Sequence, residues 1–325
     1  MSLGLPRFTF TKGLHDIGHG LYAWLQPDGG WGWSNAGLIV DGDQSLLVDT
    51  LFDVPLTRAM LAAMKSAAPR AAASIDILVN THHNGDHCFG NQCCEGAEII
   101  AHRLAREGML REGPGRLARM MTHAPQMGET GAYLSRIFGA FDFAGVTQTL
   151  PTTVFETELT RTVGDKEVRM IHVGPAHTTG DVLVHVPADK AVFTGDILFI
   201  EGHPIMWEGP VGNWIAACER ILAMDVEVVV PGHGPITDKT GVAAVRDYLL
   251  YVRDQARARF DAGLSALEAA RDIDMGDFDA WTDGERIIVN VATLYREFGA
   301  PASSEAAGAF EEMAAMAKAR AAWQA

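Results

Sequence analysis

Three histidines and one aspartate crowd into the segment Thr81–His87, whose sequence is Thr-His-His-Asn-Gly-Asp-His. Imidazole nitrogens and carboxylate oxygens are ligands that Zn²⁺ and related divalent metals prefer. The segment directly follows an apolar run, Ile75–Val79, that is typical of a buried strand. Because a loop leaving a rigid strand can direct several ligands to one point, the segment predicts a metal-binding turn and not an idle polar surface loop.

Three more metal-ligand candidates, His177, Asp196 and His233, lie far apart in the sequence. Each of them follows a strand-like run, so all three have the same strand-then-turn setting as the first segment. A sheet fixes where each of its loops begins, and we therefore expect these turns to converge on one cation site. The runs are Val168–Val173, Ala191–Thr194 and Val226–Val230.

The elements that must position these turns form an α/β pattern. Strand-like runs fill the early part of the chain, interrupted by a helix beginning near Pro55. Residues 1–240 are predicted as one domain, with a methionine-rich helical insertion at about 103–143. Residues 241–325 are rich in Ala, Arg and Glu at helical spacing and predict a helical segment packed on that domain. The early strands are predicted at Leu21–Leu25, Ala36–Val40, Ser45–Val48 and Ile75–Val79.

These motifs resemble the metallo-β-lactamase superfamily, whose hallmark is Thr-His-x-His-x-Asp-His followed by a later His, an Asp and a final His. The resemblance covers about Leu21 to Pro235 and includes Asp49 in Leu-Leu-Val-Asp-Thr, which matches the first family motif. It implies a four-layer αβ/βα sandwich, here with a helical insertion and a C-terminal helical extension. It also implies that Asp49 supports the metal loop and is not itself a ligand.

The resemblance further implies two metal positions. The first would be held by His82, by the second histidine of the motif and by His177; the second would be held by Asp86, His87 and His233, with Asp196 bridging. This chain has Asn84 where the second histidine is expected, and a neutral amide is a weaker zinc ligand than imidazole. His83 is a substitute candidate, although adjacent side chains point in different directions. We expect one or two Zn²⁺ ions, and Fe or Mn suits the same ligands.

A divalent ion lowers the pKa of bound water from about 15.7 toward roughly 7 and polarises a substrate carbonyl. Asp86 is the candidate catalytic residue, since it can orient that water or accept its proton. The leading hypothesis is a hydrolase that acts on the acyl bond of a small ester, lactone, thioester or β-lactam. One alternative is an iron-dependent oxidoreductase of the same superfamily. The other is a non-catalytic metal-binding relative that has lost a ligand.

Four aromatic or imidazole side chains are candidates for the substrate pocket. Trp31 and Trp33 lie on a glycine-rich loop between two early strands, which suits a flap over a substrate as well as an ordinary core position. His203 and Trp207 follow Asp196 closely and have the same two interpretations.

Composition narrows the class of partner. The chain has 26 basic and 41 acidic residues, a formal charge of −15 that opposes binding to nucleic acid. The residues from Met1 to Gly20 have no signal-peptide pattern, and no run is long and apolar enough to cross a bilayer. We therefore expect a cytoplasmic protein with a small-molecule substrate. The sequence assigns no role to the vicinal pair Cys93 and Cys94 and does not set the oligomeric state.

Overall fold

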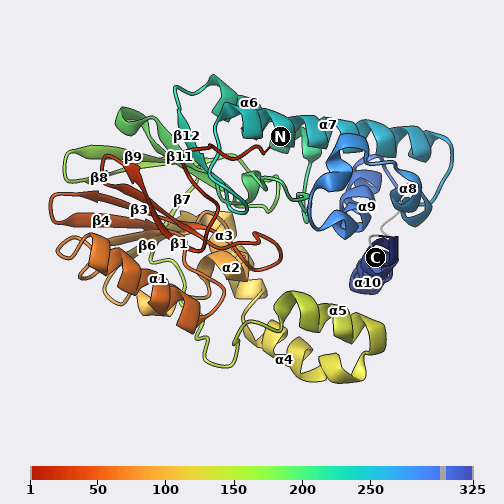
Figure 1. The fold of residues 1–325 in the computed structure, drawn as a ribbon, viewed down its shortest axis with the longest axis horizontal. Helices are drawn as coiled ribbons and strands as arrows, with labels where there is room; N and C mark the ends of the chain where they lie inside the picture. The colour runs from red at the N-terminus through yellow and green to blue at the C-terminus, as the bar shows by residue number, and fades with distance from the viewer. Residues whose placement is uncertain (1, 301–304, 324–325) are drawn as a thin grey trace.

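Two β-sheets form one half of the molecule in the computed structural model, and the C-terminal helices lie beside them (Figure 1). The structure describes residues 2–300 and 305–323. The first sheet follows the sequence order of its strands from β1 to β7, and the second has the order β12-β11-β10-β9-β8. The first sheet contains β1 Gly13–Gly18, β2 Leu21–Leu25, β3 Ala36–Asp41, β4 Gln44–Val48, β5 Ile77–Val79, β6 Glu98–His102 and β7 Thr153–Phe155. The second contains β8 Glu158–Val163, β9 Lys166–His172, β10 Val182–Val186, β11 Ala191–Phe193 and β12 Val228–Val230.

Both sheets combine antiparallel and parallel pairs. Strands β1 to β4 form an antiparallel meander, and β4 to β7 are parallel to one another. In the second sheet β11 and β12 are parallel, while the other pairs are antiparallel. The parallel pairs bring the carboxyl ends of β4, β5, β11 and β12 to the edges from which the candidate metal ligands leave.

Alternation of side chains along the strands separates the core into layers. In β4, Leu46 and Val48 face the second sheet, whereas Leu47 packs with helix α1. In β10, Val182 and Val184 face the first sheet, whereas Leu183 joins the cluster that contains α6 and α7. Successive side chains of a strand point to opposite faces, so both sheets are covered on both sides.

Helices cover the outer face of each sheet and complete the four layers (Figure 1). This arrangement confirms the predicted αβ/βα sandwich. None of the described helices is long and apolar enough to cross a membrane. The helices are α1 Val54–Ala67, α2 Gly85–Cys88, α3 Arg103–Arg111, α4 Gly115–His123, α5 Gly128–Phe138, α6 Val211–Ala223, α7 Lys239–Asp261, α8 Ala266–Asp272, α9 Ile287–Glu297 and α10 Glu305–Trp323.

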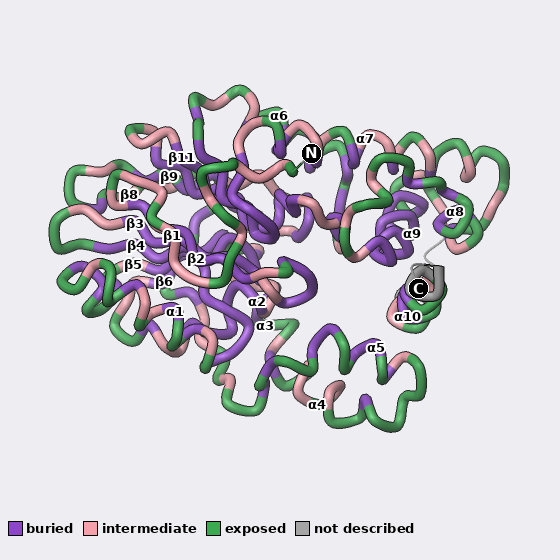
Figure 2. Tube along the Cα trace, viewed as in Figure 1, coloured by how far each residue is buried: buried purple, intermediate pink, exposed green. Residues whose placement is uncertain are grey.

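The predicted insertion at 103–143 contains three helices, α3, α4 and α5, where a helical pair is expected from the sequence. The break at Gly113–Gly115 and the second break at Pro125 divide the segment into three parts. No residue of α4 is buried, and Figure 2 shows this helix in the exposed and intermediate colours along its length. Helix α4 is therefore only partly covered: Leu117, Ala118, Met120 and Met121 pack against the main core cluster, and the rest of the helix is exposed.

The C-terminal helices pack on the insertion and on α6. Tyr248 of α7, Val291 of α9 and Met313 of α10 share one buried cluster with Trp214 of α6 and Leu134 of α5. The short turn Gly284–Arg286 connects these regions, because Glu285 accepts a hydrogen bond from the Tyr133 hydroxyl of α5 at 3.0 Å. The extension thus forms part of the wall of the site described next.

Candidate metal centre

Four loops at one edge of the two sheets carry the candidate ligands. His82 lies in the turn after β5, and Asp86 and His87 lie on the short helix α2 that continues from it. His177 lies in the connection from β9 to β10, Asp196 follows β11, and His233 follows β12. All six side chains are buried or nearly so, and the sandwich brings them together from positions far apart in the chain.

Two clusters of ligand atoms result. The first cluster is His82, His177 and Asp196, and the second cluster is Asp86, His87 and His233; within each, the ligand atoms lie within 4.8 Å of one another. Asp196 joins the two clusters. Its Oδ1 lies 3.0 Å from Nε2 of His87, and its Oδ2 lies 3.3 Å from Nε2 of His177 and 3.5 Å from Nε2 of His233.

Asp49 braces the loop that carries the first histidines. Its carboxylate accepts hydrogen bonds from the Thr81 backbone N–H and the Thr81 hydroxyl, both at 2.7 Å, and lies 2.9 Å from Nδ1 of His87. Asp49 has a φ of 63°, which a residue with a side chain rarely adopts. These contacts hold the strained backbone and orient the His87 ring, which is the supporting role that the resemblance implies for Asp49.

Backbone carbonyls orient two more rings. Nδ1 of His177 lies 2.7 Å from the Ile205 carbonyl, and Nδ1 of His233 lies 3.0 Å from the Gly29 carbonyl. When Nδ1 donates to a carbonyl, the ring is fixed in the tautomer that presents a lone pair on Nε2. The Nε2 atoms of both histidines therefore face the clusters as potential ligands.

Unsatisfied buried atoms test whether a cation fits this centre. Nε2 of His82, Nε2 of His87 and Oδ1 of Asp196 are buried and make no hydrogen bond within the described residues. A buried polar atom without a partner costs about 1–3 kcal/mol. A divalent cation bound between these atoms would satisfy all three, so the residues fit a metal centre.

Electrostatics also favours added positive charge. Burial lowers the pKa of His177 to about 4 and the pKa of His82 well below its ordinary value, so both imidazoles are neutral. Burial would raise the pKa of Asp196, but His87 and His233 outweigh it and hold that pKa well below its ordinary value. Burial would lower the pKa of His233, but Asp196 and Asp86 raise it to about 9. In the absence of a cation, Asp196 and Asp86 therefore keep the His233 imidazole protonated, and a bound metal would displace that proton.

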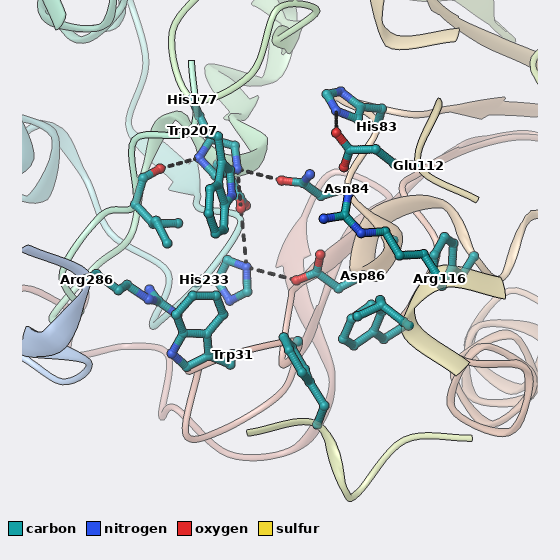
Figure 3. Close-up of a pocket in the computed structure, with 18 of the residues that line it drawn as sticks. Trp31, His83, Asn84, Asp86, Glu112, Arg116, His177, Trp207, His233 and Arg286 are labelled. Carbon is teal, nitrogen blue, oxygen red and sulfur yellow. Dashed lines mark hydrogen bonds and ion pairs between the residues drawn. The ribbon is translucent and has the colours of Figure 1, made fainter. Parts of the chain in front are cut away.

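A cavity of about 380 Å³ opens onto both clusters (Figure 3). Asp86, His177, Asp196 and His233 form part of its wall, and aromatic side chains form much of the rest. The aromatic lining residues are Trp31, Phe52, Phe89, Phe138, Phe199, Trp207 and Phe310. A pocket of this size and lining suits a small organic molecule held next to the metal ligands.

A model of the Metallo-beta-lactamase superfamily matches residues 29–233, which include every ligand of both clusters. The chain belongs to the metallo-β-lactamase superfamily. A curated relative, the hydroxyacylglutathione hydrolase of Rhizobium meliloti (strain 1021), is 29% identical over 182 residues, which cover 56% of this chain and 55% of the relative. The chain thus matches only about half the length of such relatives.

Solved structures share the fold of this chain at low sequence identity. The sec-alkylsulfatase Pisa1 from Pseudomonas sp. aligns with a TM-score of 0.67 at 19% identity, over 89% of this chain and 50% of its own. A metallo-beta-lactamase from Pontibacter korlensis aligns with a TM-score of 0.57 at 17% identity, over 74% of this chain and 99% of its own. The fold of the metallo-β-lactamase superfamily therefore extends beyond the residues matched by the family model.

Asn84 departs from the superfamily motif but stays at the metal centre. Its Oδ1 lies 2.8 Å from Nε2 of His177, which belongs to the first cluster. His83 points elsewhere, with its Nε2 3.6 Å from Oε1 of Glu112 on the far side of the cavity. The structure thus brings Asn84 to the first cluster and does not bring His83 to either one.

Of the four pocket candidates, Trp31 and Trp207 line the cavity, and their rings lie 6.2 Å apart. Trp33 packs on Phe141 with ring centroids 4.7 Å apart and does not line the cavity. His203 is buried among the C-terminal helices, where its Nε2 lies 3.0 Å from the Phe278 carbonyl. Trp33 and His203 therefore pack against other protein side chains, which is the second of the two interpretations that the sequence left open for them.

Four charged cavity residues have no counterpart in the sequence argument: Glu112, Arg116, Glu208 and Arg286. Arg286 lies in the C-terminal segment, far beyond the recognised motifs, and no spacing signal identifies it. Arg116 follows the break at Gly113–Gly115 directly, so its place at the start of a helix could be read from the sequence. The sequence does not indicate that this helix start lies near the metal ligands.

Proposed function

We propose that this protein is a metal-dependent hydrolase that cleaves the acyl bond of a small carboxylic ester or thioester. The observation that carries the proposal is the pair of ligand clusters, joined by Asp196, on the wall of one aromatic cavity. A structural metal site is normally closed by its protein ligands, whereas a centre that opens onto a substrate-sized pocket has room for water and substrate.

Zn²⁺ is the ion we propose, and when bound it would lower the pKa of water and polarise a substrate carbonyl. His82, His177 and Asp196 would hold one ion, with Asn84 beside them, and the second cluster would hold the other. Asp86 lines the cavity, and its pKa is lowered, because His87 and His233 outweigh the opposite effect of its burial. Its carboxylate is therefore ionised at neutral pH and available to accept a proton from water in the cavity.

The walls of the cavity support an acyl substrate with an apolar body. Trp31, Trp207 and Phe310 present aromatic surface beside the ligands, and aromatic walls bind the hydrocarbon part of a substrate by burial. The name of the relative from Rhizobium meliloti supports the same bond class, because a hydroxyacylglutathione is a thioester.

The experiment is a substrate panel run on protein of known metal content. Aryl esters, thioesters, lactones and a β-lactam are tested with the purified full chain, and metals are quantified by elemental analysis. We expect turnover of an ester or thioester that disappears after chelation and returns with Zn²⁺. His123→Ala, which removes an exposed imidazole on α4, is the control and should leave turnover and metal content unchanged.

Two results would contradict the proposal. The first is the absence of turnover across the panel in metal-loaded protein, which would favour a non-catalytic metal-binding relative. The second is a stoichiometric iron content with oxygen uptake, which would favour the iron-dependent oxidoreductase.

A further inference from the structure

The first turn of α4 faces the cavity that contains the metal ligands. Gly113, Arg116 and Leu117 all line this cavity, although no residue of the helix is buried. Pro114 stands at the N-cap and provides no side-chain hydrogen bond to the helix start. The positive end of the helix dipole is therefore uncapped where it meets the cavity.

Arg116 carries a guanidinium that is directed into this space. In Figure 3 its side chain extends from α4 toward the region between Asn84 and Asp86. Arg116 is exposed, and no hydrogen bond or ion pair within the described part of the chain engages its guanidinium. The nearby carboxylate of Glu112 lies 3.6 Å from Nε2 of His83, and His83 first and Arg116 more weakly hold its pKa below the ordinary value.

The other arginine of the cavity, Arg286, is buried and has protein partners for both of its Nη atoms. Its Nη1 donates to the His203 carbonyl at 2.8 Å, and its Nη2 lies 2.9 Å from Oδ2 of Asp283. Its guanidinium also stacks on the Trp31 ring, with Cζ 4.6 Å from the centroid. Nε of Arg286 is buried without a hydrogen-bond partner, but both of its Nη atoms are engaged, so Arg286 holds the wall in place. Arg116 is the cavity arginine whose whole guanidinium has no hydrogen bond or ion pair among the described residues.

We propose that Arg116 binds a carboxylate of the substrate, so that the hydrolase prefers acyl compounds that carry a second, anionic end. This inference rests on the proposed hydrolase function and specifies its substrate class. A guanidinium presents donors in a planar fork that matches a carboxylate, and the uncapped turn of α4 adds favourable charge. The aromatic walls then accommodate the hydrocarbon between that carboxylate and the acyl bond at the metal centre.

The test compares two substrates of matched length. The 4-nitrophenyl monoester of adipate carries a free carboxylate, and the 4-nitrophenyl ester of hexanoate carries a methyl group in its place. We expect metal-loaded wild-type protein to prefer the adipate ester. In Arg116→Gln the ratio of kcat/KM for the two esters should fall by at least about tenfold, the loss expected for a charged hydrogen bond. Arg116→Lys should recover part of the preference.

Arg119→Gln is the matched control, since Arg119 lies on the same helix, is exposed and does not line the cavity. It should leave the ratio unchanged. A ratio that is the same in wild type and Arg116→Gln would overturn the inference while leaving the hydrolase proposal intact, because the hexanoate ester reports turnover independently.

A binding measurement separates the inference from the hydrolase proposal. Adipate and hexanoate each offer one carboxylate to the metal centre, and only adipate has a second. In metal-loaded protein we expect adipate to bind at least about tenfold more tightly, measured by calorimetry or tryptophan fluorescence, and Arg116→Gln to abolish this difference. Such a result without turnover of any ester would support the carboxylate site and reject the hydrolase. Equal binding of the two acids to wild type would reject the carboxylate site.

Discussion

The two ligand clusters are built from similar residues but differ in charge and support. The second cluster has Asp86 as a ligand of its own, and Asp49 contacts Nδ1 of its His87. The first cluster has Asp196 as its one carboxylate, and the neutral Asn84 stands beside it where the family motif has a histidine. Since cation affinity rises with the number of anionic ligands, the second cluster should hold its ion more tightly.

The two buried carboxylates that support the ligand loops also differ. Asp49 supports the loop Thr81–His87, which supplies ligands to both clusters, and it has the His87 imidazole beside it. Asp181 supports the loop of His177 by accepting hydrogen bonds from the Thr178 N–H at 2.9 Å and from the Thr178 hydroxyl at 2.7 Å. Burial raises the pKa of both carboxylates, but His87 opposes this effect at Asp49, so Asp181 is the less compensated of the two.

Removing the second cluster should have the largest effect. In Asp86→Ala one anionic ligand and the candidate proton acceptor are lost together. We expect elemental analysis to show loss of bound metal, and kcat/KM for the best ester to fall by more than about 100-fold. Asp43→Ala, at an exposed ion pair with Arg70, is the control and should change neither quantity. Full metal content with full activity in Asp86→Ala would place the chemistry elsewhere.

Restoring the family ligand should strengthen the first cluster. In Asn84→His an imidazole replaces the amide next to His177, and we expect the metal content to rise from between one and two ions per chain toward two. His83→Gln is the matched comparison, since this side chain points to Glu112, and it should leave the metal content unchanged. An unchanged metal content in Asn84→His would show that the first cluster is not depleted in the wild type.

The smallest effect concerns Asp181, which supports the loop of His177. Burial raises the pKa of Asp181 to about 7, from an ordinary value of 3.8. The stability that this carboxyl contributes is therefore complete below about pH 3.8 and is lost as the pH rises through about 7. In metal-free protein, we expect Asp181→Asn to show a smaller fall in the free energy of unfolding between pH 5 and pH 8 than the wild type, measured by urea denaturation. An equal fall in both proteins would mean that Asp181 does not titrate in this range.

The sandwich and its ligands could be predicted because their signals are local. The motifs at Asp49, Thr81–His87, His177, Asp196 and His233 each follow a strand, which is apolar and largely buried in every case except the half-exposed β9 before His177. The strand predicted at Leu21–Leu25 coincides with β2. Strands β1, β7 and β8 were not predicted. They lie at the edges of the sheets, where partial exposure weakens the hydrophobic pattern, as the half-exposed sequence of β8 illustrates. The interior strand β6 was also missed, because its short apolar run passes directly into α3.

The cavity walls could not be predicted, because they depend on how distant segments pack. Arg286 and Phe310 reach the site from the C-terminal segment, and Arg116 reaches it from the insertion. The sequence places each of them on a helix or turn, but not at a common surface. Trp31 and Trp33 illustrate the same limit, since neighbouring tryptophans on one loop have different environments.

The turn Gly284–Arg286 has a consequence for exchanging parts between relatives. Glu285 is buried against Tyr133 and Arg136 of the insertion, and its neighbour Arg286 stacks on the Trp31 loop. A chimera that receives a foreign insertion without Tyr133 would bury this carboxylate with fewer donors, at a cost of about 1–3 kcal/mol. The insertion and the C-terminal segment should therefore be exchanged together, because exchanging either one alone would remove the contacts between them.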